Sequence, residues 1–268
     1  MPEAICTERP ASASESTRPS APPTSASPGA MGVLHALTAL HEPQAGAGAA
    51  VRALQAAAKA WGADAAVFST RLQDDATLLT HRQILACDPR WASRYAHACW
   101  SLHDPWLRHA ERSPEPADGS NLCGDSTQAQ AMVSSAAEHG FASVWVVPAP
   151  MGTEPACTHV LCLGTGRPQH FGADLPPCQG PLARLLAIEL AQWMRKQLTS
   201  DLRHRARLSE EDILLLRLDD EGHCSKSIAK RLGCSAHAID NRFHRLAQRM
   251  GTSGRKAAVR MARLYGLI

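Results

Sequence analysis

The last stretch of the chain, residues 208–268, constrains the fold most, because short helical segments alternate there with capping residues and glycines. A serine at a helix start accepts free backbone N–H groups, and a glycine just past a helix end readily adopts the conformation that stops it. The expected caps and breaks are Ser209, Gly222, Ser225, Gly233 and Ser235. They divide the stretch into four helices, and the pair joined by the tight turn at Gly233 predicts a helix-turn-helix.

The third of these helices has one apolar and one polar face. Apolar residues recur every three or four positions, at Ile239, Phe243, Leu246 and Met250. The opposite face carries His237, Asp240, Asn241, His244, Arg245 and Gln248. Such side chains can hydrogen-bond to base edges or phosphates in a major groove. We expect Asp240 to accept from a cytosine amine and Asn241 to read adenine, while Arg245 and Arg249 clamp phosphates. The expected DNA-contacting set is completed by Lys226 and Ser235.

The charge distribution agrees with this interpretation. Residues 201–268 hold 14 Lys/Arg and 8 Asp/Glu, a net charge of +6, so the overall +3 leaves −3 for residues 1–200. A basic segment attached to an acidic body is typical of a DNA-binding module. The alternative is that the polar helix face is only the solvated surface of a small bundle.

This segment resembles the LuxR-type helix-turn-helix along its whole length. The family pattern opens with Leu-Thr-x-x-Glu, and here it reads Leu208-Ser209-Glu210-Glu211-Asp212. Further matches at fixed spacing are Leu216, Gly222, Ile228-Ala229, Leu232-Gly233-Cys234-Ser235, Ala238-Ile239, Arg249-Met250-Gly251 and Gly266-Leu267-Ile268. In this family the last helix often pairs with its twin. That seam, or alternatively the core of the domain itself, would use Ala257, Ala258, Met261 and Leu264.

The composition of the whole chain limits the other possibilities. Its 268 residues suffice for two domains, and no apolar run approaches the roughly 18 residues of a membrane span. The N-terminus has no hydrophobic signal region, and nine cysteines without a C-x-x-C pair indicate reduced thiols, as in a cytoplasmic protein. The histidines show no ligand spacing, so we expect no metal and no other cofactor.

The residues before the helix-turn-helix predict an α+β body. Residues 1–32 are rich in Pro, Ser, Ala and Thr and are expected to be a disordered extension, unless translation starts at Met31. In residues 33–198 we expect helices at 33–60, 89–102, 126–138 and from 181, and strands at 65–69, 76–80, 143–147 and 158–163. Helices around a small antiparallel sheet give an α-β-α sandwich, which a polar linker at 199–207 joins to the C-terminal four-helix bundle at 208–268.

An aromatic cluster in this body is a candidate ligand site. Trp91 and Tyr95 are four apart on a helix and share a face, Asp104-Pro105 follows, and Trp106 adds aromatic surface. A buried Asp needs donors, and indole and phenol groups supply them. With a polar small molecule bound between them, Asp104 could accept an amide proton while Trp91 donates to a carbonyl. Alternatively, the aromatic residues belong to the core and the Asp begins a turn or a helix.

The segment Trp91-x-x-x-Tyr95…Asp104-Pro105 resembles the ligand-binding domain of LuxR-type quorum-sensing regulators, and the likeness extends over residues 33–198. In that family the Trp and Asp contact the head group and amide of an N-acyl-homoserine lactone, and the Tyr lines the same pocket. The chain departs from the family at Cys87, where a Tyr is usual, and at Val144, where a Gly is usual. Residues 116–123 also lack a usual Trp. Another signal molecule, or activity without ligand, therefore stays open.

The resemblance implies a transcriptional regulator, more often an activator, in which the signal stabilises the folded protein by mass action. A homodimer formed through the sandwich and residues 182–198 would place two recognition helices on a pseudo-palindromic operator, with RNA polymerase as a further possible partner. A response regulator is disfavoured because the first expected strand, 65–69, does not end in an acidic pair. An enzyme is disfavoured because the chain has no G-x-S-x-G motif and no glycine-rich phosphate loop.

Overall fold

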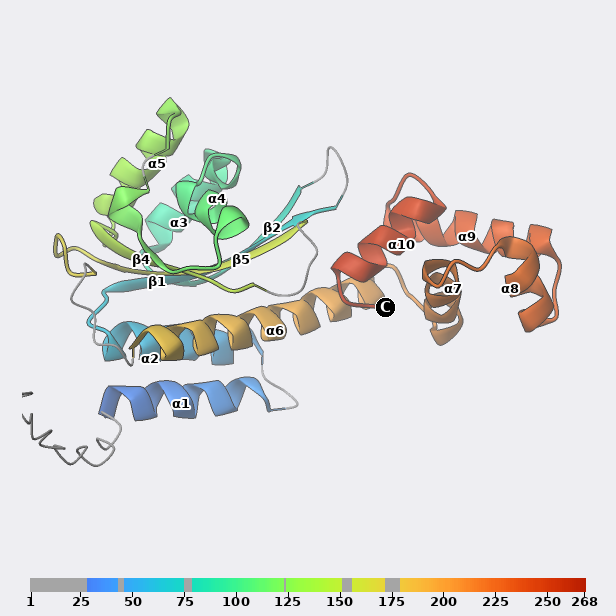
Figure 1. The fold of residues 1–268 in the computed structure, drawn as a ribbon, viewed down its shortest axis with the longest axis horizontal. Helices are drawn as coiled ribbons and strands as arrows, with labels where there is room; N and C mark the ends of the chain where they lie inside the picture. The colour runs from blue at the N-terminus through green and yellow to red at the C-terminus, as the bar shows by residue number, and fades with distance from the viewer. Residues whose placement is uncertain (1–27, 43–45, 75–78, 123, 151–155, 172–178) are drawn as a thin grey trace, which may run out of the picture.

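The computed structural model describes residues 28–42, 46–74, 79–122, 124–150, 156–171 and 179–268. Figure 1 shows an α/β part and a helical part, joined by one long helix. Of the expected disordered extension, residues 1–27 lie outside the described residues. Residues 28–32 are helical instead, because helix α1 spans Pro28–Leu40. None of the helices in the described ranges combines the length and apolar character that a membrane span requires.

The α/β part is built on a five-stranded antiparallel sheet with strand order β2-β1-β5-β4-β3. The strands are β1 (Ala65–Gln73), β2 (Leu79–Ala86), β3 (Ala117–Asp118), β4 (Ser143–Pro148) and β5 (Cys157–Thr165). Strands β1 and β5 pair from Ala65↔Gly164 to Leu72↔Cys157. The predicted antiparallel sheet is therefore confirmed.

Helices cover both faces of this sheet (Figure 1). One face carries α2 (Ala47–Ala60) and α6 (Gln179–Arg205), with α1 packed on their outer side, and the other carries α3 (Pro89–His97), α4 (Pro105–Arg112) and α5 (Thr127–Ala137). Alternate residues of β1 supply the two cores: Ala66 and Phe68 pack with α2 and α6, whereas Val67 packs with α3 and α4. The predicted α-β-α sandwich is thus confirmed, and the second core contains the candidate ligand site.

Several element boundaries differ from the prediction. The helix expected over 33–60 is two helices, α1 and α2, and the strand expected at 76–80 is observed at Leu79–Ala86, while residues 75–78 lie outside the described ranges. The helix from Pro89 stops at His97, and Cys99 then takes a left-handed conformation with φ 52°. Helix α4 and the short β3 were not predicted from the sequence.

The polar linker expected at 199–207 is helical as far as Arg205. Leu198 and Leu202 of α6, and Ala206 just after it, are buried, so the connector carries an apolar stripe among its polar residues and the helix continues. One continuous hydrophobic cluster therefore joins the long helix to the C-terminal unit.

The C-terminal unit consists of α7 (Glu210–Asp220), α8 (Ser225–Leu232), α9 (Ala236–Met250) and α10 (Arg255–Leu264). Ser209 and Asp212 form a reciprocal capping box at the start of α7. Ser235 caps α9 by accepting from the N–H of Ala238 at 3.1 Å. The cap of α8 is Cys224, one residue before the predicted Ser225. The turn between α8 and α9 needs Gly233, whose φ is +67°.

The C-terminal unit docks on the end of the β1–β2 hairpin. The Tyr265 hydroxyl donates to Thr80 Oγ1 at 3.3 Å, and Arg260 Nη2 donates to the Gln73 carbonyl at 3.0 Å. The Thr199 hydroxyl of α6 donates to the Tyr265 carbonyl. On α10, Ala258, Met261 and Leu264 are buried, so in this structure they close the core of their own unit, which is one of the two predicted alternatives.

Candidate functional site

The structure brings the four predicted ligand-site residues together beneath α3 and α4. Pro89 starts α3, and Asp88 caps it by accepting from the N–H of Arg90 at 2.9 Å. This start places Trp91 and Tyr95 one turn apart on the face toward the sheet, with ring centroids 5.3 Å apart. The Tyr95 hydroxyl donates to Asp104 Oδ2 at 2.7 Å.

Asp104 has a structural role as well as a place in the site. It is the N-cap of α4, and its Oδ1 accepts from the backbone N–H groups of Trp106 at 2.8 Å and Leu107 at 3.3 Å. Burial raises the pKa of the Asp104 carboxyl, while its hydrogen bonds act in the opposite direction. Burial, and then the nearby Asp104, also raise the pKa of Tyr95, so the phenol stays protonated and acts as a donor.

The aromatic rings of the site share a neighbour, Phe141, which follows α5. Its ring centroid lies 4.8 Å from that of Trp91 and 5.8 Å from that of Trp106. Among the described residues, Trp91 Nε1 and Trp106 Nε1 are buried without a hydrogen-bond partner. A buried N–H without an acceptor is unfavourable by about 1–3 kcal/mol. The site is therefore chemically suited to a ligand that brings hydrogen-bond acceptors.

Two polar residues that the sequence analysis did not single out also line this region. Arg71 of β1 pairs in register with His81 of β2. Arg71 forms an ion pair with Glu111 and donates from Nη1 to the Ser101 carbonyl at 2.9 Å. His81 stacks on Tyr95 with a centroid distance of 5.6 Å, and burial, helped by the charge of Arg71, lowers its pKa to about 4.

A sequence signal for these residues was available. Ser69 and Arg71 follow Ala65 and Val67 at alternate positions of β1, so their side chains face the same side of the sheet as these two core residues. Arg71 also bears on the chemistry of the site, because its half-buried cation interacts with Asp104.

Two of the three departures from the family pattern, Cys87 and Val144, have clear structural settings. Cys87 packs at the margin of the aromatic core, and burial raises the pKa of its thiol to about 11, so it is uncharged at neutral pH. Val144 faces Gly119: a Cβ added to Gly119 would lie 2.9 Å from Val144 Cβ and 3.0 Å from Trp106 Nε1. The glycine at 119 thus accommodates the valine at 144.

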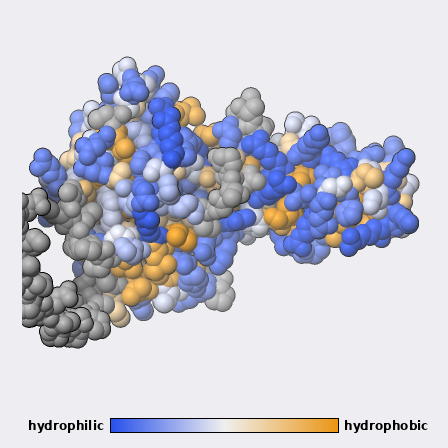
Figure 2. Space-filling view, viewed as in Figure 1, coloured by the Kyte–Doolittle hydropathy of each residue, from blue (hydrophilic) through white to orange (hydrophobic). Residues whose placement is uncertain are grey.

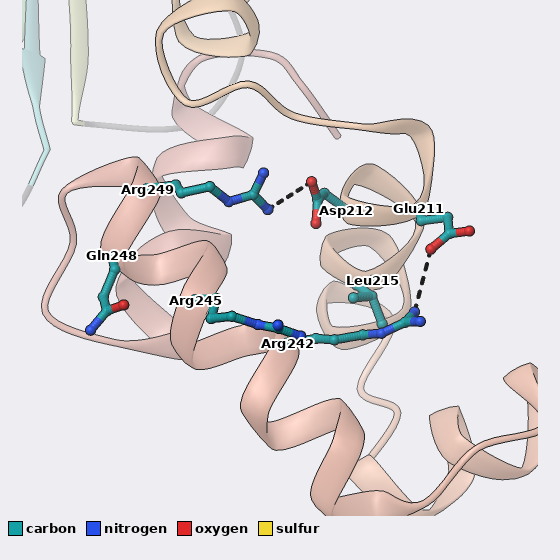
Figure 3. Close-up of a pocket in the computed structure, with 7 residues that line it drawn as sticks. All are labelled: Glu211, Asp212, Leu215, Arg242, Arg245, Gln248 and Arg249. Atoms are coloured by element: carbon teal, nitrogen blue, oxygen red, sulfur yellow. Dashed lines mark hydrogen bonds and ion pairs between the residues drawn. The ribbon is translucent and has the colours of Figure 1, made fainter.

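In the C-terminal unit, α9 presents an exposed polar face. His237, Asn241, His244 and Arg245 are exposed there, and Lys226 is exposed on α8. A groove of about 620 Å³ runs between this helix and the start of α7, and Figure 3 shows the residues that line it. Arg245 lies along this groove, so its guanidinium is accessible to a large anionic partner.

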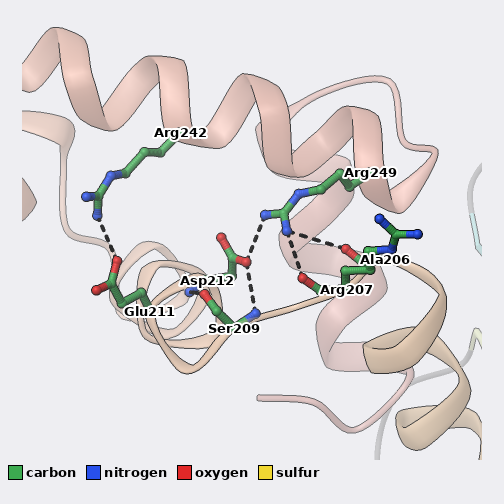
Figure 4. Close-up of polar contacts among 7 residues, drawn as sticks. All are labelled: Ala206, Arg207, Ser209, Glu211, Asp212, Arg242 and Arg249. Carbon is green, nitrogen blue, oxygen red and sulfur yellow. Dashed lines mark hydrogen bonds and ion pairs between the residues drawn. The ribbon is translucent and has the colours of Figure 1, made fainter.

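Arg249, the other predicted phosphate clamp, is exposed, and its guanidinium also has partners within the unit. Its guanidinium donates to Asp212 Oδ2 at 2.8 Å and to the Arg207 carbonyl at 2.8 Å (Figure 4). Asp212 is the residue that completes the capping box, so Arg249 braces the start of α7. Arg242, on the same helix, pairs with Glu211 at 3.5 Å.

Asp240 and Ser235, two other predicted DNA contacts, also have intramolecular partners. Asp240 Oδ1 accepts from the Ser225 hydroxyl at 2.5 Å and lies 3.6 Å from Arg255 Nη1. The hydroxyl of Ser235 is occupied in capping α9.

Arg255, which the sequence analysis missed, links three helices. It donates from Nε to Asp219 Oδ1 at 2.6 Å, and its guanidinium lies 4.0 Å from the centroid of the Phe243 ring. Across the described ranges, no three His, Cys, Asp or Glu side chains are grouped so as to hold a metal ion.

Comparisons with known proteins identify the α/β part. Residues 47–192 match the family model described as the autoinducer binding domain. The comparison with curated proteins gave no match.

Solved structures match over more of the chain. Escherichia coli SdiA has 16% sequence identity and a TM-score of 0.65, covering 88% of this chain and 97% of SdiA. SdiA in complex with octanoyl-rac-glycerol has 15% identity and a TM-score of 0.60, covering 88% of this chain and 94% of that chain. The N-acylhomoserine lactone dependent LuxR family protein CepR2 from Burkholderia cenocepacia has 20% identity and a TM-score of 0.46, covering 61% of this chain and 91% of CepR2. The likeness to SdiA shows that the fold is shared across both parts.

Proposed function

Because this chain belongs to the autoinducer-binding family of LuxR-type quorum-sensing regulators, we propose that it is a signal-dependent, DNA-binding transcriptional regulator. The observation that carries the sensory half of this proposal is the buried constellation of Trp91, Tyr95 and Asp104. It combines an indole N–H that lacks an acceptor with a carboxylate fixed by a phenol and by two backbone N–H groups.

The first candidate signal is an N-acyl-homoserine lactone. Trp91 Nε1 would donate to a carbonyl of the ligand, and Asp104 Oδ2 would accept the amide proton with its remaining lone pair. Insertion of the acyl chain among the buried aromatic side chains would add apolar contact and stabilise the native state by mass action.

A second candidate is an acylglycerol. Cys87 and Val144 change the donors and the shape of the site relative to the family pattern, which favours a ligand other than the usual lactone. The fold likeness to SdiA, which has been solved with octanoyl-rac-glycerol, supplies a defined test compound.

Thermal unfolding separates these candidates from a receptor that needs no ligand. A bound signal at 100 times its dissociation constant should stabilise the protein by about 2.7 kcal/mol. The Trp91→Phe variant should lose most of this gain, whereas Trp61→Phe, which alters a buried indole on the opposite face of the sheet, should keep it. Operator binding without any added compound, together with no shift for lactones or acylglycerols, would refute the signal-dependent proposal.

For the DNA-binding half, we propose that α9 enters the major groove. His237, Asp240 and Asn241 lie on its N-terminal half, where base edges would be reached, and Arg245 and Lys226 would contact phosphates. Support comes from the exposure of the polar face of α9 and from the net charge of +6 on residues 201–268.

Binding to randomised duplexes tests this assignment. Arg245→Ala should weaken binding to all sequences alike and reduce its salt dependence, whereas Asn241→Ala should change which bases are preferred. Arg90→Ala, which removes an exposed cation of the α/β part, serves as the charge-matched control. Equal losses on selected and random DNA for both helix variants would contradict the base-reading role.

We also propose a homodimer that brings two copies of α9 to a pseudo-palindromic operator. Figure 2 shows an apolar patch on the α/β part where α1 and α6 run. Exposed Leu34 and Leu185, at 39% and 41%, belong to these helices. Leu185→Glu should therefore yield monomers in sedimentation and weaken operator binding, whereas Leu102→Glu, on the opposite side of the sheet, should not.

The remaining expectations follow from this role. The proposed protein is cytoplasmic, has no enzymatic activity and acts on transcription, with RNA polymerase as a partner if it activates. A reporter gene placed downstream of the selected operator gives the sign of regulation.

A further inference from the structure

We propose that Trp106 is a second ligand-binding donor, so that the signal carries two hydrogen-bond acceptors, one for each buried indole. This inference rests on the proposed function, because it specifies the chemistry of the molecule that the sensory site takes. Its starting observation is that Trp106 Nε1, like Trp91 Nε1, is buried without a hydrogen-bond partner.

The two indoles belong to one site although they come from different helices. Trp91 lies on α3 and Trp106 on α4, and both rings pack against Phe141 at centroid distances of 4.8 and 5.8 Å. Their exposed fractions are 1% and 2%, so solvent does not satisfy either N–H from the surface. Both unpartnered donors therefore belong to side chains of the same aromatic cluster.

The neighbouring acceptor in the protein is already in use. The carboxylate of Asp104 accepts from the Tyr95 hydroxyl and from the backbone N–H groups of Trp106 and Leu107. The indole of Trp106 points elsewhere, toward Gly119, where a Cβ would lie 3.0 Å from Nε1. Gly119, Val144 and Val146 pack closely around this donor, so an acceptor of the ligand reaches Nε1 only if these neighbours shift.

This arrangement selects a chemical class. A molecule with two separated acceptor oxygens satisfies both N–H groups; examples are the amide and lactone carbonyls of an acylated lactone, or the ester carbonyl and a hydroxyl of an acylglycerol. A molecule with an equally long alkyl chain but a single hydroxyl satisfies at most one. Because a site with buried donors discriminates strongly against analogues that leave them unpaired, the single-acceptor molecule should bind much more weakly.

The test follows the indole N–H resonances of protein labelled with ¹⁵N-tryptophan. N-octanoyl-homoserine lactone and 1-octanoyl-rac-glycerol are the two-acceptor probes, and 1-octanol is the control compound. Trp→Phe variants assign the signals. The resonances of Trp91 and Trp106 should both move downfield and saturate with at least one two-acceptor probe, while the signal of Trp61 on the other face stays in place.

Affinity provides the second readout. Trp106→Phe should weaken binding of the active probe about tenfold, and Trp61→Phe should leave it unchanged. A shift of Trp91 alone, or an unchanged affinity in Trp106→Phe, would overturn the role of Trp106 and leave the proposed receptor function intact. If neither resonance shifts with any probe, both this inference and the proposed ligand classes are overturned. If Trp106→Phe does not fold, the resonance shifts in the wild-type protein decide.

Discussion

Replacement of Asp104 by alanine should destabilise the protein even when no signal is present. The side chain accepts from the buried Tyr95 hydroxyl at 2.7 Å and from two backbone N–H groups at the start of α4. Loss of a helix N-cap is unfavourable by about 0.5–2 kcal/mol. A buried hydroxyl left without its acceptor adds about 1–3 kcal/mol. The free energy of unfolding should therefore fall by roughly 2–5 kcal/mol.

Asp104→Asn is the informative companion. Its amide oxygen can keep the cap of α4, and its amide NH₂ can donate to the Tyr95 oxygen, so a loss of about 1 kcal/mol is expected. Urea unfolding of the ligand-free protein, followed by tryptophan fluorescence, measures both variants. Tyr95→Phe combined with Asp104→Ala completes a double-mutant cycle, in which the second change should be smaller than in the wild type.

The reasoning is refuted if Asp104→Ala unfolds within about 0.5 kcal/mol of the wild type. That result would mean that the carboxylate serves the ligand only. The expected result instead means that loss of signalling in an Asp104 variant is not, by itself, evidence of a lost ligand contact.

Three further predictions concern other parts of the molecule. The free energy of unfolding should decline as the pH falls from 6.5 toward 4, by up to about 1.4 kcal/mol per pH unit for each of His81 and His159. Burial lowers the pKa of both histidines to about 4, so the unfolded chain binds protons before the folded protein does. Urea titrations at several pH values measure the decline. A free energy of unfolding that does not change over this pH range would contradict the prediction. Arg249→Ala should destabilise the C-terminal unit by about 1 kcal/mol, which unfolding followed by circular dichroism would show. DNA titration should not show the salt-dependent loss of binding that is expected when a phosphate contact is removed. Gly164→Ala should cost about 1–3 kcal/mol in the same urea assay, because its Cβ would lie 2.2 Å from a buried phenyl ring, whereas Gly180→Ala, with open space around it, should be harmless.

The C-terminal unit was the most predictable part of the fold. Its helices are short and separated by local signals, so Ser209, Ser235 and Gly233 set their limits almost without tertiary information. Strand and helix limits in the α/β part were harder to predict, because they depend on packing. The continuation of α6 to Arg205, for example, depends on burial of Leu202 against a distant part of the chain.

The candidate site was predictable where spacing along one helix decides the geometry, as for Trp91 and Tyr95. The site residues contributed by the sheet, Arg71 and His81, were not predictable in this way. Strand register brings them together from positions that sequence spacing alone does not connect. Similarly, the amphipathic pattern placed Arg249 on a helix face, but only the fold shows that this cation is engaged by Asp212.

The hairpin formed by β1 and β2 contacts both the candidate ligand site and the C-terminal unit. Arg71 and His81 line the candidate ligand site, and Gln73 and Thr80, nearer the hairpin end of each strand, accept hydrogen bonds from Arg260 and Tyr265 of the C-terminal unit. The two-stranded ribbon thus links the candidate ligand site directly to the C-terminal unit, in addition to the connection through the long helix.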